Sequence, residues 1–152
     1  MYTELLFLSL FALYMLINVF DDVKTHTTKN MYHYPMAGII LITSGFMGVG
    51  ISTFLIGIYT LVFFILFSNI PIIQFGAGDI KMLVNVYMML NLFSPFDTVT
   101  LFSVISVVYF IVSYSFEFLV RMKRKKLKGA FVHAEAPAIL TTFALITFLI
   151  TR

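Results

Sequence analysis

Two acidic residues stand at the edges of strongly apolar runs, where a charged side chain is costly. Asp22 follows the first run, and Asp79 precedes the fourth, directly after Gly76 and Gly78 in the segment FGAGDIKM. Two neighbouring carboxyl groups tend to share one proton, because like charges at short range do not both ionise easily. The ionised group can take a proton from an attacking water, while the protonated group donates a hydrogen bond to the carbonyl oxygen under attack. If Asp22 and Asp79 meet, they can hydrolyse a peptide bond.

Few other side chains in this sequence offer catalytic or metal-binding chemistry. The chain contains no cysteine, which excludes disulfides and thiolate metal sites. Its three histidines, His26, His33 and His133, are scattered and show no metal-binding spacing. We therefore expect neither a metal nor another cofactor. The net charge of +3 does not indicate a nucleic-acid partner, because the positions of the basic residues explain it better.

The composition is that of a membrane protein. Of 152 residues, 61% are hydrophobic and 11% are charged, whereas soluble domains average about 45–50% and about 25%. We predict an all-α, polytopic membrane protein, a bundle of about six transmembrane helices forming a single domain over residues 1–152. The apolar runs are Tyr2 to Phe20, Met31 to Val49, Ile51 to Ser68, Ile80 to Phe93, Thr98 to Val120 and Ala136 to Ile150. The fourth and sixth are shorter than the usual span of about 20 residues, which local thinning of the bilayer can accommodate.

The basic residues predict the orientation. With the N-terminus outside, the segments 21–30, 69–79 and 121–133 face the cytoplasm, together with nine of the ten Lys and Arg residues. This agrees with the positive-inside rule. The run RMKRKKLK then serves as a topology anchor rather than as a binding site for anionic lipid or an acidic partner. We expect a multi-pass protein of the plasma membrane with Asp22 and Asp79 at the cytoplasmic face.

The two glycines predict a close approach of another backbone. Gly76 and Gly78 lack a Cβ atom, so the segment can take positive φ and can admit an extended peptide substrate beside Asp79. Each acid also has an ordinary interpretation. Asp79 fits a helix N-cap, and Asp22 fits a polar residue at the membrane interface, where it follows the end of the first helix.

The segment GAGDIKM resembles the G-x-G-D-x-K motif of type IV prepilin peptidases and the related archaeal preflagellin peptidases. These enzymes also carry D-x-[KR]-x-x-x-I-P-N after the first helix. The segment DVKTHTTKN matches that pattern at Asp22, Lys24 and Asn30, whereas Thr28 and Lys29 stand where the family has Ile and Pro. This register favours Asp22 over its neighbour Asp21.

The resemblance implies an intramembrane aspartic endopeptidase with Asp22 and Asp79 as its catalytic pair. The family removes short basic leader peptides from type IV pilin-like precursors at the cytoplasmic face, just before the hydrophobic helix of the precursor. Larger members of the family carry a cysteine-bearing insertion and also methylate the new N-terminus, and this chain has no such insertion. It is similar to the small, peptidase-only members that serve tight-adherence or competence pili. The residues that the resemblance assigns to supporting roles are Gly76, Gly78, Lys81, Lys24, Asn30 and Pro137, the last at the start of the final helix.

A different class of function remains open. Carboxylates in membrane proteins often mark ion or proton pathways, so the chain could instead be a six-helix carrier or an assembly subunit. The position of both acids at one face argues against a path across the bilayer.

We expect structural roles for four further polar residues. Lys81 should extend its charged group toward the membrane surface, and Asn85 should hydrogen-bond between helices. Glu117 and Glu135 should pair with neighbouring Arg or Lys rather than contact a basic leader.

Overall fold

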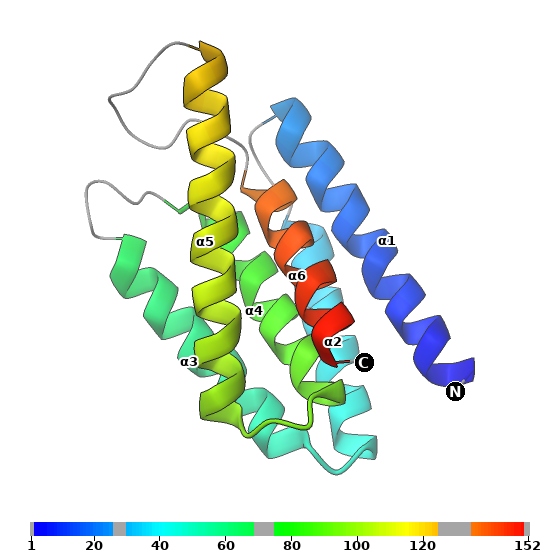
Figure 1. The fold of residues 1–152 in the computed structure, drawn as a ribbon. Coiled ribbons are helices and arrows are strands. Elements are labelled where there is room, and N and C mark those ends of the chain that lie inside the picture. Colours follow the sequence, from blue (N-terminus) through cyan, green and yellow to red (C-terminus); the bar gives the residue numbers. More distant parts are fainter. Residues whose placement is uncertain (1, 26–29, 69–74, 125–134, 151–152) are drawn as a thin grey trace.

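The protein is an all-α bundle, as predicted. A computed structural model describes residues 2–25, 30–68, 75–124 and 135–150, and these form six helices without any strand (Figure 1). The helices are α1 (Tyr2–Thr25), α2 (Asn30–Phe46), α3 (Gly50–Ser68), α4 (Ala77–Phe93), α5 (Thr98–Arg124) and α6 (Ala136–Ile150). Two predicted bounds are wrong. Helix α1 continues past Phe20, so Asp22 lies inside the helix rather than after it, and α4 begins at Ala77 rather than at Ile80.

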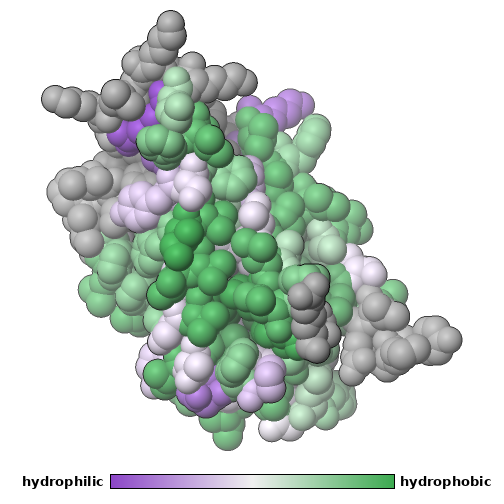
Figure 2. All heavy atoms as spheres, in the orientation of Figure 1, coloured by the Kyte–Doolittle hydropathy of each residue, from purple (hydrophilic) through white to green (hydrophobic). Residues whose placement is uncertain are grey.

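Three helices are long and apolar enough to cross a membrane. Their candidate spans are Leu6–Thr25, Gly50–Ser68 and Thr98–Met122, and α6 is a shorter apolar helix. Many large apolar side chains, such as Phe46 and Ile51, are exposed on the surface. Apolar residues cover the middle of the visible face, and polar residues lie toward its two ends (Figure 2). A surface of this kind suits lipid and identifies a membrane protein; the number of spans beyond three and the orientation stay predictions.

Helix α4 lies at the centre of the bundle. It packs against α2, α3, α5 and α6, and an almost unbroken run of its side chains is buried from Met82 to Leu92. Helix α6 packs against both α1 and α4, whereas α1 and α4 have no close backbone contact of their own. The first and fourth helices meet through side chains, as in the hydrogen bond from Asn85 to Tyr14, rather than through close backbone packing. The final helix lies between them.

Successive helices run in opposite directions, which brings particular ends together (Figure 1). Helices α1 and α5 finish, and α4 and α6 begin, at the same end of the bundle, here called the site end. At the opposite end, α2 and α3 are joined by a tight turn in which Gly48 has a φ of 75°, a conformation that favours glycine. The boundary between the second and third apolar runs is therefore a turn.

A polar network that joins three helices lies among the apolar side chains of the interior. The Asn85 side-chain amide donates to the Tyr14 hydroxyl and to the His33 carbonyl oxygen, each at 3.0 Å. The Tyr14 hydroxyl in turn lies 2.7 Å from His33 Nδ1. The prediction that Asn85 bonds between helices is thus confirmed, and this network ties α1, α2 and α4 together. Hydrogen bonds of this kind satisfy polar groups that would be costly in an apolar interior.

Candidate active site

Asp22 is held at the N-terminus of another helix. Its side chain is 4% exposed, and its Oδ2 accepts a hydrogen bond of 2.8 Å from the backbone N–H of Ala136. Ala136 is the first residue of α6, so this N–H is among the four that a helix leaves without an internal partner. The positive end of the helix dipole also favours a negative group at this position. The helix that separates α1 from α4 therefore provides a binding partner for Asp22.

Asp79 lies at the N-terminus of its own helix. Gly76 is the N-cap of α4, and the Gly76 N–H donates to Asp79 Oδ2 at 3.1 Å. Asp79 is thus the third helical residue, and the interpretation of Asp79 as the N-cap itself is wrong by three positions. Both acids lie where a helix presents unpaired amide groups, an environment that suits carboxylates.

The expected role of positive φ at the glycines is wrong. Gly76 has φ −67° and ψ 147°, an extended conformation open to any residue, and Gly78 lies in the first turn of α4. Among the described glycines only Gly48 has positive φ. Space explains the glycine at position 76 instead, because a Cβ atom there would lie 2.7 Å from Asp79 Oδ2. The absence of a side chain leaves room for the catalytic candidate itself.

A third carboxyl group reaches the same region. Glu135, the residue before α6, is 6% exposed, and its Oε2 accepts hydrogen bonds from the Tyr109 hydroxyl at 2.8 Å and the Ser113 hydroxyl at 3.1 Å. Glu117 pairs with Arg121 one turn along α5, as predicted, whereas the partners shown for Glu135 are hydroxyl groups of α5. The sequence reasoning did not place Glu135 beside the two aspartates. The signals available were its position directly before the last apolar run and the one-turn spacing of Tyr109 and Ser113.

The three acids form one electrostatic group. The Asp79 carboxyl group interacts electrostatically with both Asp22 and Glu135. The Tyr109 hydroxyl interacts electrostatically with Glu135 and Asp79. The structure therefore brings Asp22 and Asp79 into one neighbourhood, although 57 positions separate them in the sequence. No group of three His, Cys, Asp or Glu side chains is arranged to hold a metal ion in the described part of the chain. The arrangement suits acid–base chemistry by a pair of carboxyl groups.

The remaining predicted residues belong to helix segments at the site end of the bundle. Lys24 is exposed on the last turn of α1, and Asn30 begins α2. Lys81 is partly buried, and its Nζ lies 5.2 Å from the centre of the Tyr34 ring of α2, within the range of a cation–π interaction. Pro137 is the second residue of α6, where its missing N–H removes no helical hydrogen bond. The placement of Lys81 near the membrane surface stays a prediction.

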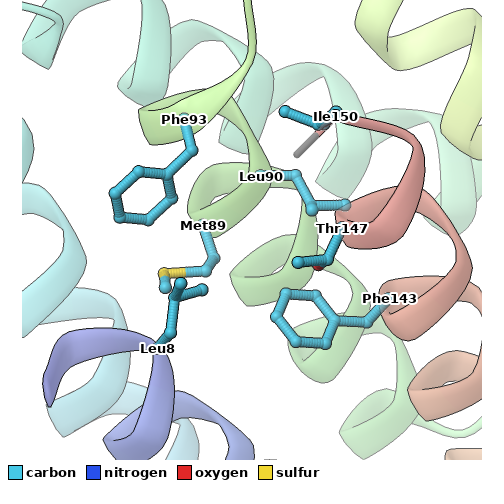
Figure 3. A pocket seen from close by; sticks show the side chains of 7 residues that line it. All are labelled: Leu8, Met89, Leu90, Phe93, Phe143, Thr147 and Ile150. Carbon is cyan, nitrogen blue, oxygen red and sulfur yellow. The ribbon is translucent and has the colours of Figure 1, made fainter. Parts of the chain in front are cut away.

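An apolar pocket of about 200 Å³ opens between α1, α4 and α6, away from the acids (Figure 3). Side chains from all three helices point into it, and its lining residues are Leu8, Met89, Leu90, Phe93, Phe143, Thr147 and Ile150. Met89 comes ten residues after Asp79, a separation of about 15 Å along a helix. This pocket is therefore distinct from the carboxyl group cluster.

Comparison with known proteins gives no match. No family model matches the chain, and neither a curated protein nor a solved structure does. The functional argument therefore depends on the residues of this chain and on the geometry that they adopt.

Proposed function

We propose that this protein is an intramembrane aspartic endopeptidase with Asp22 and Asp79 as its catalytic pair. The observation that carries the proposal is the convergence of these two acids from helices without close backbone contact, each acid beside the N-terminus of a helix. An ordinary capping aspartate or an ordinary interfacial aspartate has no need of the other. Their joint placement favours a shared chemical role.

The mechanism follows from a pair that holds one proton between two carboxyl groups. The ionised carboxylate accepts a proton from water as the water oxygen attacks the carbonyl carbon of the scissile peptide bond. The protonated partner donates a hydrogen bond to the carbonyl oxygen and stabilises the tetrahedral intermediate. When the C–N bond breaks, the leaving nitrogen takes the proton that came from water. The products are a peptide with a new carboxylate and a peptide with a new amino terminus.

The proposed substrates are type IV pilin-like precursors, each with a short basic leader before a hydrophobic helix. The hydrophobic helix would place the precursor in the same membrane as the enzyme. The proposed location is the plasma membrane, with several spans, the N-terminus outside and the site end at the cytoplasmic face. The distribution of Lys and Arg residues supports this orientation.

The second candidate is a carrier or assembly subunit that moves protons or cations. The observation that favours it is the buried network of Tyr14, His33 and Asn85, since Asn85 lies about 9 Å further along α4 than Asp79. Polar groups at such a depth can belong to a relay. The network contains no carboxylate, and hydrogen bonding between helices explains it fully, so the peptidase is the better supported function.

The test is co-expression with a precursor that carries a short basic leader, a glycine and an apolar helix, scored by its size on a gel. The single variants Asp22→Asn and Asp79→Asn should each lose nearly all cleavage, because an amide can neither take a proton from water nor share one. The double variant should be scarcely worse, since residues that act as a unit are strongly non-additive. The pH profile of the native enzyme's activity should be bell-shaped, and its two apparent pKa values should belong to the pair of carboxyl groups as a unit.

Two control variants complete the experiment. Asp97→Asn removes a carboxylate at the opposite end of the bundle, and asparagine also caps helices well, so cleavage should remain normal. Asp21→Asn should keep most activity, because adjacent side chains point about 100° apart around a helix. Substantial cleavage by Asp79→Asn would refute the aspartic mechanism. Absence of cleavage by the native protein, together with proton or cation flux in liposomes, would favour the carrier.

A further inference from the structure

Glu135 occupies the N-cap position of α6, and its side chain bonds to a different helix. The Ile139 N–H donates to the Glu135 carbonyl oxygen at 3.0 Å, which is the first internal hydrogen bond of α6. A capping side chain normally turns back to accept from the second or third helical N–H. The Glu135 carboxyl group instead turns to α5 and accepts from the hydroxyl groups of Tyr109 and Ser113.

The orientation of Glu135 has a direct consequence for Asp22. Ala136 follows Glu135 immediately, and the Ala136 N–H donates to Asp22 Oδ2 at 2.8 Å. The contacts therefore form a continuous path from α5 through Glu135 and the first amide of α6 to Asp22. Tyr109 and Ser113, which lie one turn apart on α5 and are both buried, fix one end of this path. A helix N-terminus held from one side by Glu135 presents its first N–H to the catalytic candidate on the other.

We propose that Glu135 is a positioning residue for the catalytic pair: by binding Tyr109 and Ser113 it fixes the N-terminus of α6, which in turn orients Asp22 through the Ala136 N–H. This proposal rests on the proposed peptidase function. Two alternative roles give different kinetics. A residue that contacts the basic leader affects the KM of the precursor, and a residue that only stabilises the fold affects the amount of folded protein. A positioning residue affects kcat.

The test uses the full-length protein purified in detergent, with kcat and KM measured for the precursor. Glu135→Ala removes both hydrogen-bond acceptors and should lower kcat about 100-fold, since displacing a catalytic group by about 1 Å has an effect of that order. Its KM should stay within about twofold of the native value. Glu135→Gln keeps an oxygen for the Tyr109 hydroxyl and should restore kcat to within about tenfold of native. Asp97→Asn serves as the control and should have native kinetics.

Tyr109→Phe tests the same path from its other end. It removes the 2.8 Å hydrogen bond while Glu135 stays in place, so kcat should fall and KM should not. The double variant Glu135→Ala with Tyr109→Phe should be no slower than Glu135→Ala alone, because both changes break one path. The single variant Tyr109→Phe keeps the aromatic ring and its packing. It therefore provides a folded protein for the measurement if Glu135→Ala is poorly produced.

Three results would overturn the proposal. A raised KM with native kcat in the Glu135 variants would assign Glu135 to leader binding. Native kcat in Tyr109→Phe and Glu135→Ala would show that neither residue orients the pair. Loss of folded protein with native kcat in the surviving fraction would assign a purely structural role. Each of these leaves the peptidase itself intact, whereas full activity of Asp22→Asn would refute the peptidase whatever Glu135 does.

Discussion

The glycine at position 76 gives the sharpest test of the site geometry. A methyl group added there would bring its Cβ atom to 2.7 Å from Asp79 Oδ2, and to 3.7 Å from the carboxyl carbon. Ordinary contacts of a Cβ atom begin at 3.4 Å, so the carboxylate must retreat by about 0.7 Å or more in Gly76→Ala. The hydrogen bond from the Gly76 N–H to the same oxygen must also distort. The substitution therefore displaces the catalytic candidate without changing its chemistry.

The expected magnitude follows from this displacement. Misplacing a reacting group by about 1 Å costs about 100-fold in rate, so a shift of about 0.7 Å should lower kcat by roughly 25-fold. The backbone at position 76 has φ −67° and ψ 147°, which alanine adopts without strain, so the fold should be unaffected. A stable protein with kcat lowered roughly 25-fold is the expected result.

The assay is precursor conversion in membranes, with expression levels matched by blot. Gly38→Ala is the matched control, because a Cβ atom at Gly38 meets nothing within 4 Å and the residue lies in α2, where alanine is favoured. Its cleavage rate should equal that of the native protein. Native kcat in Gly76→Ala would refute the reasoning, since the carboxylate would then tolerate a displacement that the mechanism does not allow.

Two other predictions concern the network and the topology. Tyr14→Phe removes a hydroxyl that Asn85 and His33 both contact, so it should lower the free energy of unfolding in detergent by about 1 kcal/mol. The control Tyr59→Phe changes an exposed side chain of α3 and should have no effect. Equal stability of the two variants would contradict this role of the network. The chain has no cysteine, so a single thiol introduced at Phe96 should react with an impermeant reagent in intact cells, whereas one at Met122 should react only after permeabilisation. The reverse labelling pattern would invert the orientation and place the acids outside.

The sequence predicted the helices well because their physical signal is local. An apolar run of sufficient length favours a helix in lipid, where every backbone polar group must be satisfied within the segment. The paired glutamate and arginine of α5 follow the same logic, since Glu117 and Arg121 are one turn apart. Asn85 was recognised because an amide in an apolar helix needs a partner on another helix. The partners themselves, Tyr14 and His33, were not recognisable, because they lie 71 and 52 positions away.

The sequence also indicated Asp22 and Asp79 as candidate catalytic residues. Both stand at the edges of apolar runs, Asp79 follows the two glycines, and Asp22 has the motif spacing to Lys24. Their roles in the helices were misjudged. The end of α1 and the start of α4 each differ from the predicted bounds by several residues, because a helix can continue beyond its apolar run when its polar side chains find partners in the bundle. The role of Gly76 was misjudged for a related reason, since the close contact that a Cβ atom would make there is with the placed side chain of Asp79.

The tertiary structure alone decided how the site is held together. The hydrogen bond between Asp22 and the Ala136 N–H joins residues 114 positions apart, and the bonds of Glu135 to α5 span 22 and 26 positions. Such contacts depend on which helices pack side by side, and in this bundle α6 lies between α1 and α4. The apolar patterns of the six runs are alike and leave that choice open. Composition and motif therefore determined a helical membrane protein with two candidate acids, whereas the packing of α6 decided that a helix N-terminus and a third acid would meet them.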